Sequence, residues 1–147
     1  MSLAPSLFSS GKDDWETPDE LFSRLNRFYH FVLDAAANEV NHKCPRWFGP
    51  GGEVEDALLA TWPLKEGNVW LNPPYSRGLQ VKFVKKAISE RSRGSAGKVV
   101  CLLPARTDTR LFHELLLPRA RIEFLRGRLK FKGAKSSAPF PSLIAVI

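Results

Sequence analysis

The sequence predicts an α/β domain with an open sheet and helices on both faces, and three observations indicate this fold class. First, residues 98–104 form a continuous apolar run, which is typical of a parallel strand buried on both faces. Second, residues 78–93 have the apolar spacing of an amphipathic helix. Third, the apolar strand 68–71 runs into Asn72-Pro73-Pro74-Tyr75, whose prolines cannot continue a sheet. Alternating strands and helices of this kind favour an α/β architecture.

Length and charge bound the organisation. The 147 residues are enough for one domain, and we expect a loose segment at 1–12 followed by a single domain over 13–147. Lys and Arg number 22 against 15 Asp and Glu, a formal charge of +7. This surplus favours a polyanionic partner such as nucleic acid.

The two cysteines, Cys44 and Cys101, predict no disulfide framework, so a reducing cytoplasm is expected. His42 lies near Cys44, but no second Cys or His pair completes a zinc spacing, and no metal is expected. Residues 1–10 lack the features of a signal peptide, and no apolar run approaches a membrane span, so neither secretion nor membrane insertion is expected.

The first helix has a clear predicted start. Thr17 is expected as its N-cap, Pro18 as its first residue and Glu20 as the partner in a capping box. One face is then apolar, with Leu21, Phe22, Leu25 and Tyr29 at helical spacing. Trp15 either packs on this helix, which the spacing slightly favours, or forms one wall of a cofactor pocket.

Residues 31–38 predict a buried strand that ends at Asp34 and continues into small side chains, Ala35, Ala36 and Ala37. Small residues after a first strand let a ligand approach the backbone, and Asp34 could bond a polar group on it; a simple capping role for Asp34 is equally favoured. Residues 38–55 are expected to be irregular, with a short strand at Trp47-Phe48. A short helix follows, capped by Asp56, which could otherwise accept a hydrogen bond from a cofactor amine.

The tetrapeptide Asn72-Pro73-Pro74-Tyr75 indicates chemistry on a planar amine. It leaves the sheet at a strand's carboxyl end, where open α/β folds bind ligands. The Asn72 side-chain oxygen and the Pro73 carbonyl could accept hydrogen bonds from a conjugated amine and free its lone pair for attack. The Tyr75 ring could stack on the planar substrate, a contact worth about 1–3 kcal/mol. The alternative is a proline-rich turn without function.

Polar and basic residues gather in the second half. A cluster at the end of strand 98–104 would share an edge with Asn72 and Asp34 if the strands are parallel, although Thr107 or Asp108 could simply cap the helix that carries Leu111, Phe112, Leu115 and Leu116. This cluster consists of Arg106, Thr107, Asp108, Thr109 and Arg110. The outward stripe Lys82, Lys85, Lys86 and Arg93 on the helix 78–93 is expected to be solvated, with phosphate contact as the alternative.

The last third predicts two strands, 122–131 and 142–147, joined by a mobile loop. Its positive charge is interleaved with Phe131 and Phe140, as in a nucleic-acid surface; charge on an edge strand also prevents aggregation. The basic residues are Arg126, Arg128, Lys130, Lys132 and Lys135.

From Asp14 onward, the chain resembles the phage-type DNA N6-adenine methyltransferases. The motifs that carry the resemblance occur in order as Trp15-Glu16-Thr17-Pro18, Leu33-Asp34-Ala35-Ala36-Ala37, Glu55-Asp56-Ala57-Leu58 with Trp62, Asn72-Pro73-Pro74-Tyr75, Leu103-Pro104-Ala105-Arg106-Thr107-Asp108-Thr109 and Ala138-Pro139-Phe140-Pro141-Ser142. The resemblance implies a Rossmann-like class I methyltransferase sheet that binds S-adenosylmethionine and acts on DNA.

By the same resemblance, Asn72 and Pro73 act on the adenine amino group and Tyr75 stacks on the base, within a catalytic loop that includes Pro74. The cofactor site would comprise Trp15, Thr17, Pro18, Asp34, Ala35, Ala36, Asp56 and Asn72. Two departures concern this site, because alanines replace the usual glycines after the first strand and no acidic residue ends a second one. Sequence preference would come from loops 106–110 and 126–140.

The resemblance implies direct methyl transfer onto N6 after base flipping, without a covalent intermediate or a metal. Three alternatives stay open: methylation of cytosine N4, methylation of a protein glutamine, and an inactive nucleic-acid-binding module of the same fold. The expected location is the cytoplasm of a bacterial host, for a chain encoded by the bacterium or a phage.

Overall fold

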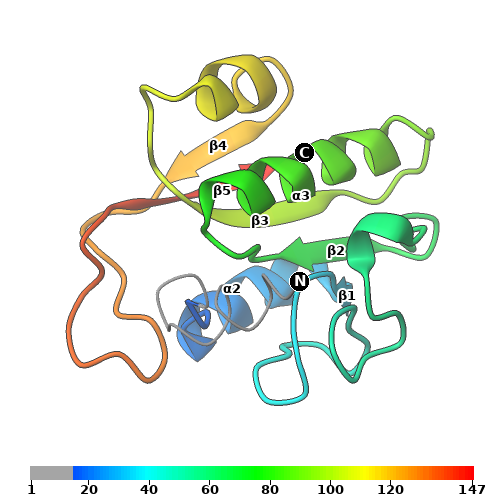
Figure 1. Cartoon of the computed structure of the whole chain (residues 1–147), viewed down its shortest axis with the longest axis horizontal. Helices are drawn as coiled ribbons and strands as arrows, with labels where there is room; N and C mark the ends of the chain where they lie inside the picture. The colour runs from blue at the N-terminus through cyan, green and yellow to red at the C-terminus, as the bar shows by residue number, and fades with distance from the viewer. Residues whose placement is uncertain (1–14) are drawn as a thin grey trace.

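The computed structural model describes residues 15–147, apart from the side chain of Arg77, so the predicted loose segment 1–12 lies outside the described residues. The helices and strands alternate along the chain (Figure 1). In order they are α2 (Asp19–Tyr29), β1 (Phe31–Asp34), the 3₁₀ helix η1 (Ala57–Leu59), β2 (Asn68–Leu71), α3 (Arg77–Arg91), β3 (Val99–Pro104), the π-helix η2 (Leu111–Leu116), β4 (Arg121–Phe124) and β5 (Ser142–Val146).

The strands form one open, mixed sheet in the order β1-β2-β3-β5-β4. The β1, β2 and β3 strands are parallel, whereas β5 is antiparallel to both of its neighbours. Every residue of β3 is buried, as the continuous apolar run predicted. The α/β class is therefore confirmed, and the carboxyl ends of three strands share one edge.

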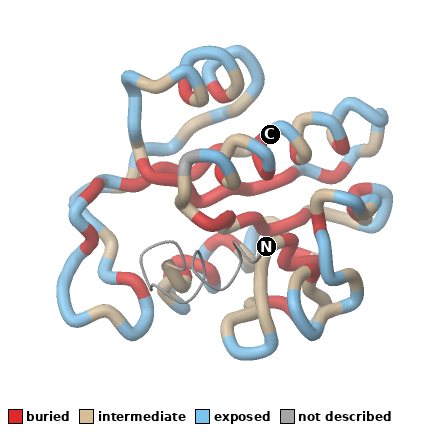
Figure 2. The backbone as a smooth tube through the Cα atoms, viewed as in Figure 1, coloured by how far each residue is buried: buried red, intermediate tan, exposed pale blue. Residues whose placement is uncertain are grey.

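Helices cover both faces of this sheet, also as predicted (Figures 1 and 2). Side chains alternate along a strand, so Val69 and Leu71 of β2 face one way and Trp70 the other. The α3 helix packs on the side of Val69 and Leu71, together with η2. The α2 helix packs on the Trp70 side through the predicted residues Leu21, Phe22 and Leu25.

The predicted N-cap of α2 is wrong. The helix begins at Asp19, Pro18 occupies the capping position, and no side chain caps the helix. The Thr17 hydroxyl instead accepts a hydrogen bond from Asn72 Nδ2. Thr17 Oγ1, which the local sequence predicts as the cap of the helix, therefore bonds to the distant Asn72 instead.

The predicted strand over 122–131 is too long, because β4 ends at Phe124. Gly127 has a φ of 72°, a left-handed conformation that does not continue a strand. Arg126, Arg128 and Lys130 consequently lie in the connection to β5, and the account of them as charges on an edge strand is wrong.

Candidate active site

A cavity of about 830 Å³ opens at the carboxyl edge of the parallel strands. Its wall comes from four parts of the chain: residues 15–17, parts of 34–50, residues 55–58 and parts of 70–83. Open α/β sheets bind ligands at this edge. A volume of this size suits a ligand the size of a nucleoside derivative.

The cavity brings together most of the residues predicted for a cofactor. Seven of the eight line it, and Pro18 does not. The seven are Trp15, Thr17, Asp34, Ala35, Ala36, Asp56 and Asn72. For Trp15 the sequence leaves two positions open, packing on the first helix or forming one wall of a cofactor pocket. Its ring lies 5.2 Å from Phe131 and 5.3 Å from Phe140, centroid to centroid, and Trp15 is one of the residues that line the cavity.

Asn72 follows the end of β2, as its position before two prolines requires. Its Nδ2 donates to the carbonyl of Trp15 at 2.6 Å and to the hydroxyl of Thr17 at 3.0 Å. Its Oδ1 is buried and has no hydrogen-bond partner among the described residues. A buried acceptor without a partner costs stability, and Asn72 lines the cavity, so this oxygen is a candidate acceptor for a donor on a ligand.

Of the other three residues of the tetrapeptide, only one lines the cavity. Pro74 lines the cavity, whereas Pro73 and Tyr75 are outside its lining. The Tyr75 ring packs edge-on against Phe140 and Phe131, at centroid distances of 5.7 and 6.2 Å. Its hydroxyl donates to the carbonyl of Leu102 at 3.2 Å, and burial raises the pKa of this phenol well above its usual range. These contacts hold the loop against the sheet.

Asp34 is a buried carboxyl group in the cavity wall. Burial raises its pKa to about 7, opposed by backbone N–H groups and by the charges of His42 and Lys43. The N–H groups belong to Lys43, at 3.0 Å, and to Ala36, at 3.2 Å. The side chain caps the local turn, as one of the two interpretations predicted, and Asp34 also lines the cavity, where its hydrogen bond to a ligand stays a prediction.

Asp56 also caps a helix and lines the cavity. Its carboxylate accepts a hydrogen bond from the Leu58 N–H at 3.0 Å, which confirms the predicted cap, and it lines the cavity. Glu55 and Lys82 line the cavity as well, although neither was predicted as a site residue. The sequence signal for Glu55 is its position next to Asp56, a predicted site residue. Lys82 gives no such signal, because its spacing predicts a solvated position on the outer stripe of α3.

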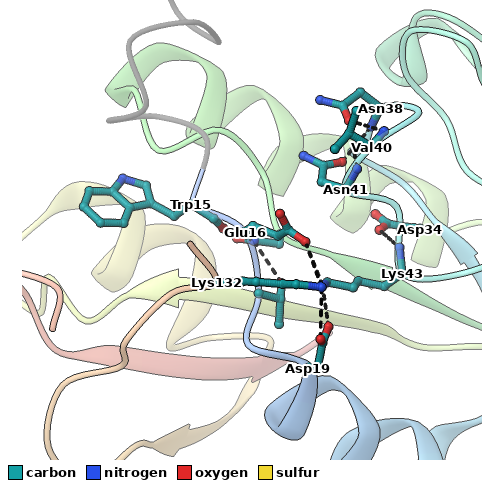
Figure 3. Close-up of polar contacts among 11 residues, drawn as sticks. Trp15, Glu16, Asp19, Asp34, Asn38, Val40, Asn41, Lys43 and Lys132 are labelled. Carbon is teal, nitrogen blue, oxygen red and sulfur yellow. Dashed lines mark hydrogen bonds and ion pairs between the residues drawn. The ribbon is translucent and has the colours of Figure 1, made fainter. Parts of the chain in front are cut away.

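Four charged side chains form a cluster (Figure 3), and two of them, Glu16 and Lys43, line the cavity. The Lys43 ammonium, whose side chain is 8% exposed, lies 3.1 Å from Glu16 and 2.9 Å from Asp19. Lys132 lies 3.0 Å from Asp19 and 3.8 Å from Glu16, and its N–H donates to the Glu16 carbonyl. Hydrogen bonds from Lys43 and Lys132 lower the pKa of Asp19. Glu16 and Lys43 were not predicted, because their pairing depends on the folded chain.

The residues predicted for nucleic acid lie outside the cavity lining. Arg106 sits 5.6 Å from the centre of the Phe140 ring, and the Ala105 N–H donates to the Pro141 carbonyl. Loops 106–110 and 126–140 are therefore neighbours. The exposed members are Arg106, Thr107, Asp108, Arg110, Arg126, Arg128, Lys130, Lys132 and Lys135.

One predicted feature of this surface, the exposure of its two aromatic rings, is wrong. Phe131 and Phe140, expected to be interleaved with the basic residues on the surface, are 2% and 7% exposed. They anchor loop 126–140 beneath Trp15 and Tyr75 and cannot stack on bases in this arrangement. Arg110 is bound to Glu114 at 3.0 Å, and the charge of Lys132 is offset by Asp19 and Glu16.

The cysteines are poor candidates for a nucleophile. Both are buried, and burial raises the pKa of Cys44 to about 12 and that of Cys101 still further. Within residues 15–147, no group of three or more His, Cys, Asp and Glu side chains could hold a metal ion. Over the same residues, no helix has the length and apolar character needed to cross a membrane.

Comparison with known proteins identifies the family. Residues 6–142 match the family described as DNA N-6-adenine-methyltransferase (Dam). A DNA N-6-adenine-methyltransferase of Escherichia phage T1 is 37% identical over 119 residues, which cover 80% of this chain and 47% of that protein. One of the same name from Haemophilus phage HP1 (strain HP1c1) is 37% identical over 84 residues, covering 55% and 44%. The chain thus spans about half the length of these curated relatives. With the family match covering most of its residues, the chain belongs to the DNA N-6-adenine-methyltransferase (Dam) family.

Proposed function

We propose that the protein is an S-adenosylmethionine-dependent DNA methyltransferase that adds a methyl group to the N6 amino group of adenine. The observation that carries this proposal is that Asn72 lines a cavity of about 830 Å³ and has a buried side-chain oxygen, Oδ1, with no hydrogen-bond partner within residues 15–147. The names of the phage relatives support adenine as the target.

The finer fold assignment belongs to the same proposal. Three parallel strands, a helix layer on each face and a cavity at the carboxyl edge support a Rossmann-like class I methyltransferase sheet. We further propose that residues 13–147 form a single methyltransferase domain whose DNA-recognition region is loops 106–110 and 126–140. Those loops are neighbours in the structure through the contact between Arg106 and the Phe140 ring.

The volume of the cavity and the chemistry of its wall support the proposed cofactor. Ala35, Ala36 and Ala37 allow a ligand to approach the backbone after β1, and Phe48 and Leu58 offer apolar surface to an adenosyl group. The carboxylates of Asp34, Glu55 and Asp56 suit its amine and hydroxyl groups. S-adenosylmethionine supplies, when bound, a methyl group activated by a sulfonium.

The chain's own contribution is to prepare the amine. Asn72 Oδ1 accepts a hydrogen bond from the amino group, and the Pro73 carbonyl is proposed as the second acceptor. Two acceptors draw the nitrogen toward tetrahedral geometry and free its lone pair. Positioning of this kind carries most of the rate, with no nucleophilic residue of the enzyme required, and both cysteines are buried and protonated.

DNA is the proposed partner of the exposed basic loops. Because a paired adenine hides N6, the base must be flipped, which costs a few kcal/mol. Phosphate contacts from exposed residues such as Arg126, Arg128 and Lys130 would offset that cost. We propose the cytoplasm of a bacterial host as the protein's location.

The test is incubation with S-adenosylmethionine labelled in its methyl group and with DNA, followed by nucleoside analysis. Label in N6-methyladenine is the expected result. Label in N4-methylcytosine or in protein glutamine would replace the proposed substrate. No label at all, with cofactor and DNA both bound, would identify an inactive binding module.

A further inference from the structure

The hydroxyl of Thr17 is buried against the Asn72 amide. Thr17 is 2% exposed, and its Oγ1 lies 3.0 Å from Asn72 Nδ2. The same nitrogen donates to the Trp15 carbonyl at 2.6 Å. Both hydrogens of the side-chain NH₂ group therefore have acceptors, and both acceptors belong to the short segment before α2.

These two acceptors determine which way the amide faces. A carbonyl oxygen only accepts, so the Trp15 carbonyl tolerates the amide nitrogen and would repel the amide oxygen. The Thr17 hydroxyl can accept or donate, so by itself it would not distinguish the two orientations. Together they engage both N–H bonds, which fixes the plane of the amide as well as its direction.

The segment that carries these acceptors is itself held in place. The Trp15 ring packs against Phe131 and Phe140, and the Glu16 carbonyl accepts from the Lys132 N–H at 2.9 Å. The Glu16 carboxylate lies 3.1 Å from the Lys43 ammonium (Figure 3). Contacts on both sides therefore keep Trp15 and Thr17 at a set position relative to Asn72.

We propose that Thr17 is a positioning residue of the reaction: the Trp15 carbonyl sets which end of the Asn72 amide carries the nitrogen, and Thr17 fixes the plane of the amide, so that Oδ1 is aimed at the amino group to be methylated. Without Thr17 the amide would rotate, and Oδ1 would be aimed at the amino group for only part of the time. This inference rests on the proposed function. It gives Thr17 a role distinct from the cofactor contact that the family resemblance implies.

The kinetic test compares Thr17→Val, which keeps the shape and removes the acceptor, with Thr17→Ser, which keeps the hydroxyl. We expect Thr17→Val to lower kcat about tenfold or more, while KM for DNA and Kd for the cofactor change less than about threefold. Thr17→Ser should restore kcat to within about threefold of wild type. Thr61→Val, at an exposed threonine outside the cavity lining, is the matched control and should leave all three constants unchanged.

A second readout does not depend on turnover. In ¹⁵N-labelled protein, the two side-chain amide protons of Asn72, identified by their loss in Asn72→Ala, should exchange slowly with solvent. Thr17→Val should accelerate their exchange about tenfold, and Thr17→Ser should not.

The outcomes separate the two proposals. An unchanged kcat in Thr17→Val, or an equal loss in Thr17→Ser, would overturn the positioning role. A weaker cofactor Kd with unchanged kcat would assign Thr17 to cofactor binding instead. If the wild type methylates no adenine while the exchange pattern holds, the proposed function fails and the orientation of Asn72 stands as a structural fact.

Discussion

The ammonium group of Lys132 lies 3.0 Å from the carboxylate of Asp19, which joins loop 126–140 to the first turn of α2. Asp19 raises the pKa of Lys132, and Glu16 at 3.8 Å adds to the effect. Lys132 therefore already has acidic partners, whereas the nearby Lys130 is exposed and forms no ion pair within residues 15–147.

This difference predicts unequal contributions to DNA binding. Each phosphate contact contributes roughly 0.9 to the slope of log K against log salt. Lys130→Met should reduce the slope by about that amount, and Lys132→Met by less than half of it. Binding isotherms at several salt concentrations measure both slopes. Equal reductions would show that Lys132 leaves its acidic partners to contact phosphate.

Asn72→Ala should abolish turnover, because it removes the only side-chain acceptor proposed for the amino group. We expect kcat to fall by about 10²-fold or more, with cofactor affinity nearly unchanged. Single-turnover kinetics and calorimetric titration with the cofactor measure the two effects. Turnover at the wild-type rate would remove Asn72 from the mechanism.

Tyr75 offers a separate test, because its hydroxyl and its ring have different partners. Tyr75→Phe loses the hydrogen bond to the Leu102 carbonyl, so stability should fall by about 1 kcal/mol while most activity remains. Tyr75→Ala also loses the packing against Phe131 and Phe140, which should cost about 3–5 kcal/mol and the activity. Urea unfolding and methyl-transfer rates measure these effects. Full activity in a folded Tyr75→Ala protein would exclude both base stacking and loop support.

Asp34 predicts how stability depends on pH. Its pKa rises from 3.8 to about 7 on folding because the carboxyl group is buried, so the folded state holds the proton more tightly. Its contribution to stability is full below about pH 4 and is lost as the pH rises through about 7, a change of at most about 4 kcal/mol.

The matched variant for this prediction is Asp34→Asn, which does not titrate. It leaves one of the N–H groups of Ala36 and Lys43 without an acceptor and should be less stable overall. The decisive quantity is the slope: between about pH 4 and pH 8, the wild-type free energy of unfolding should decline relative to that of the variant. Parallel curves would mean that Asp34 is ionised throughout this range.

Glu90 predicts a stability effect away from the site. This buried carboxylate accepts from the Trp62 N–H at 2.7 Å and from the Lys86 ammonium at 3.1 Å. Glu90→Ala leaves both donors unpaired and should cost about 3–5 kcal/mol, whereas Glu90→Gln should cost about 1–2 kcal/mol. Glu66→Ala, which removes an exposed ion pair with Arg46, should cost less than about 1 kcal/mol in the same urea titrations.

The sequence predicts the sheet well wherever burial is decided locally. The run 98–104 and the stretch ending at Asn72 contain enough apolar residues to indicate β3 and β2, and the spacing of Leu21, Phe22 and Leu25 indicates α2. Asp34 and Asn72 then follow as edge residues, because parallel strands end together. The cavity residues were predictable from strand order more than from their types.

The errors come from contacts between distant segments. Thr17 looks like an N-cap in its local sequence, and only the folded chain offers it the Asn72 amide instead. Phe131 and Phe140 look like surface aromatics among basic residues until Trp15 and Tyr75 cover them. The ion pair between Glu16 and Lys132 cannot be predicted from local sequence, because the two residues are far apart along the chain.

The hydrogen bond from the Lys132 N–H to the Glu16 carbonyl joins two stretches from opposite ends of the described chain. Local opening of either stretch would separate Trp15, whose carbonyl holds Asn72, from the rings of Phe131 and Phe140 in loop 126–140. The cavity wall and the basic loop therefore form one cooperative unit, and a ligand that orders either part reduces the entropy that the other still has to lose.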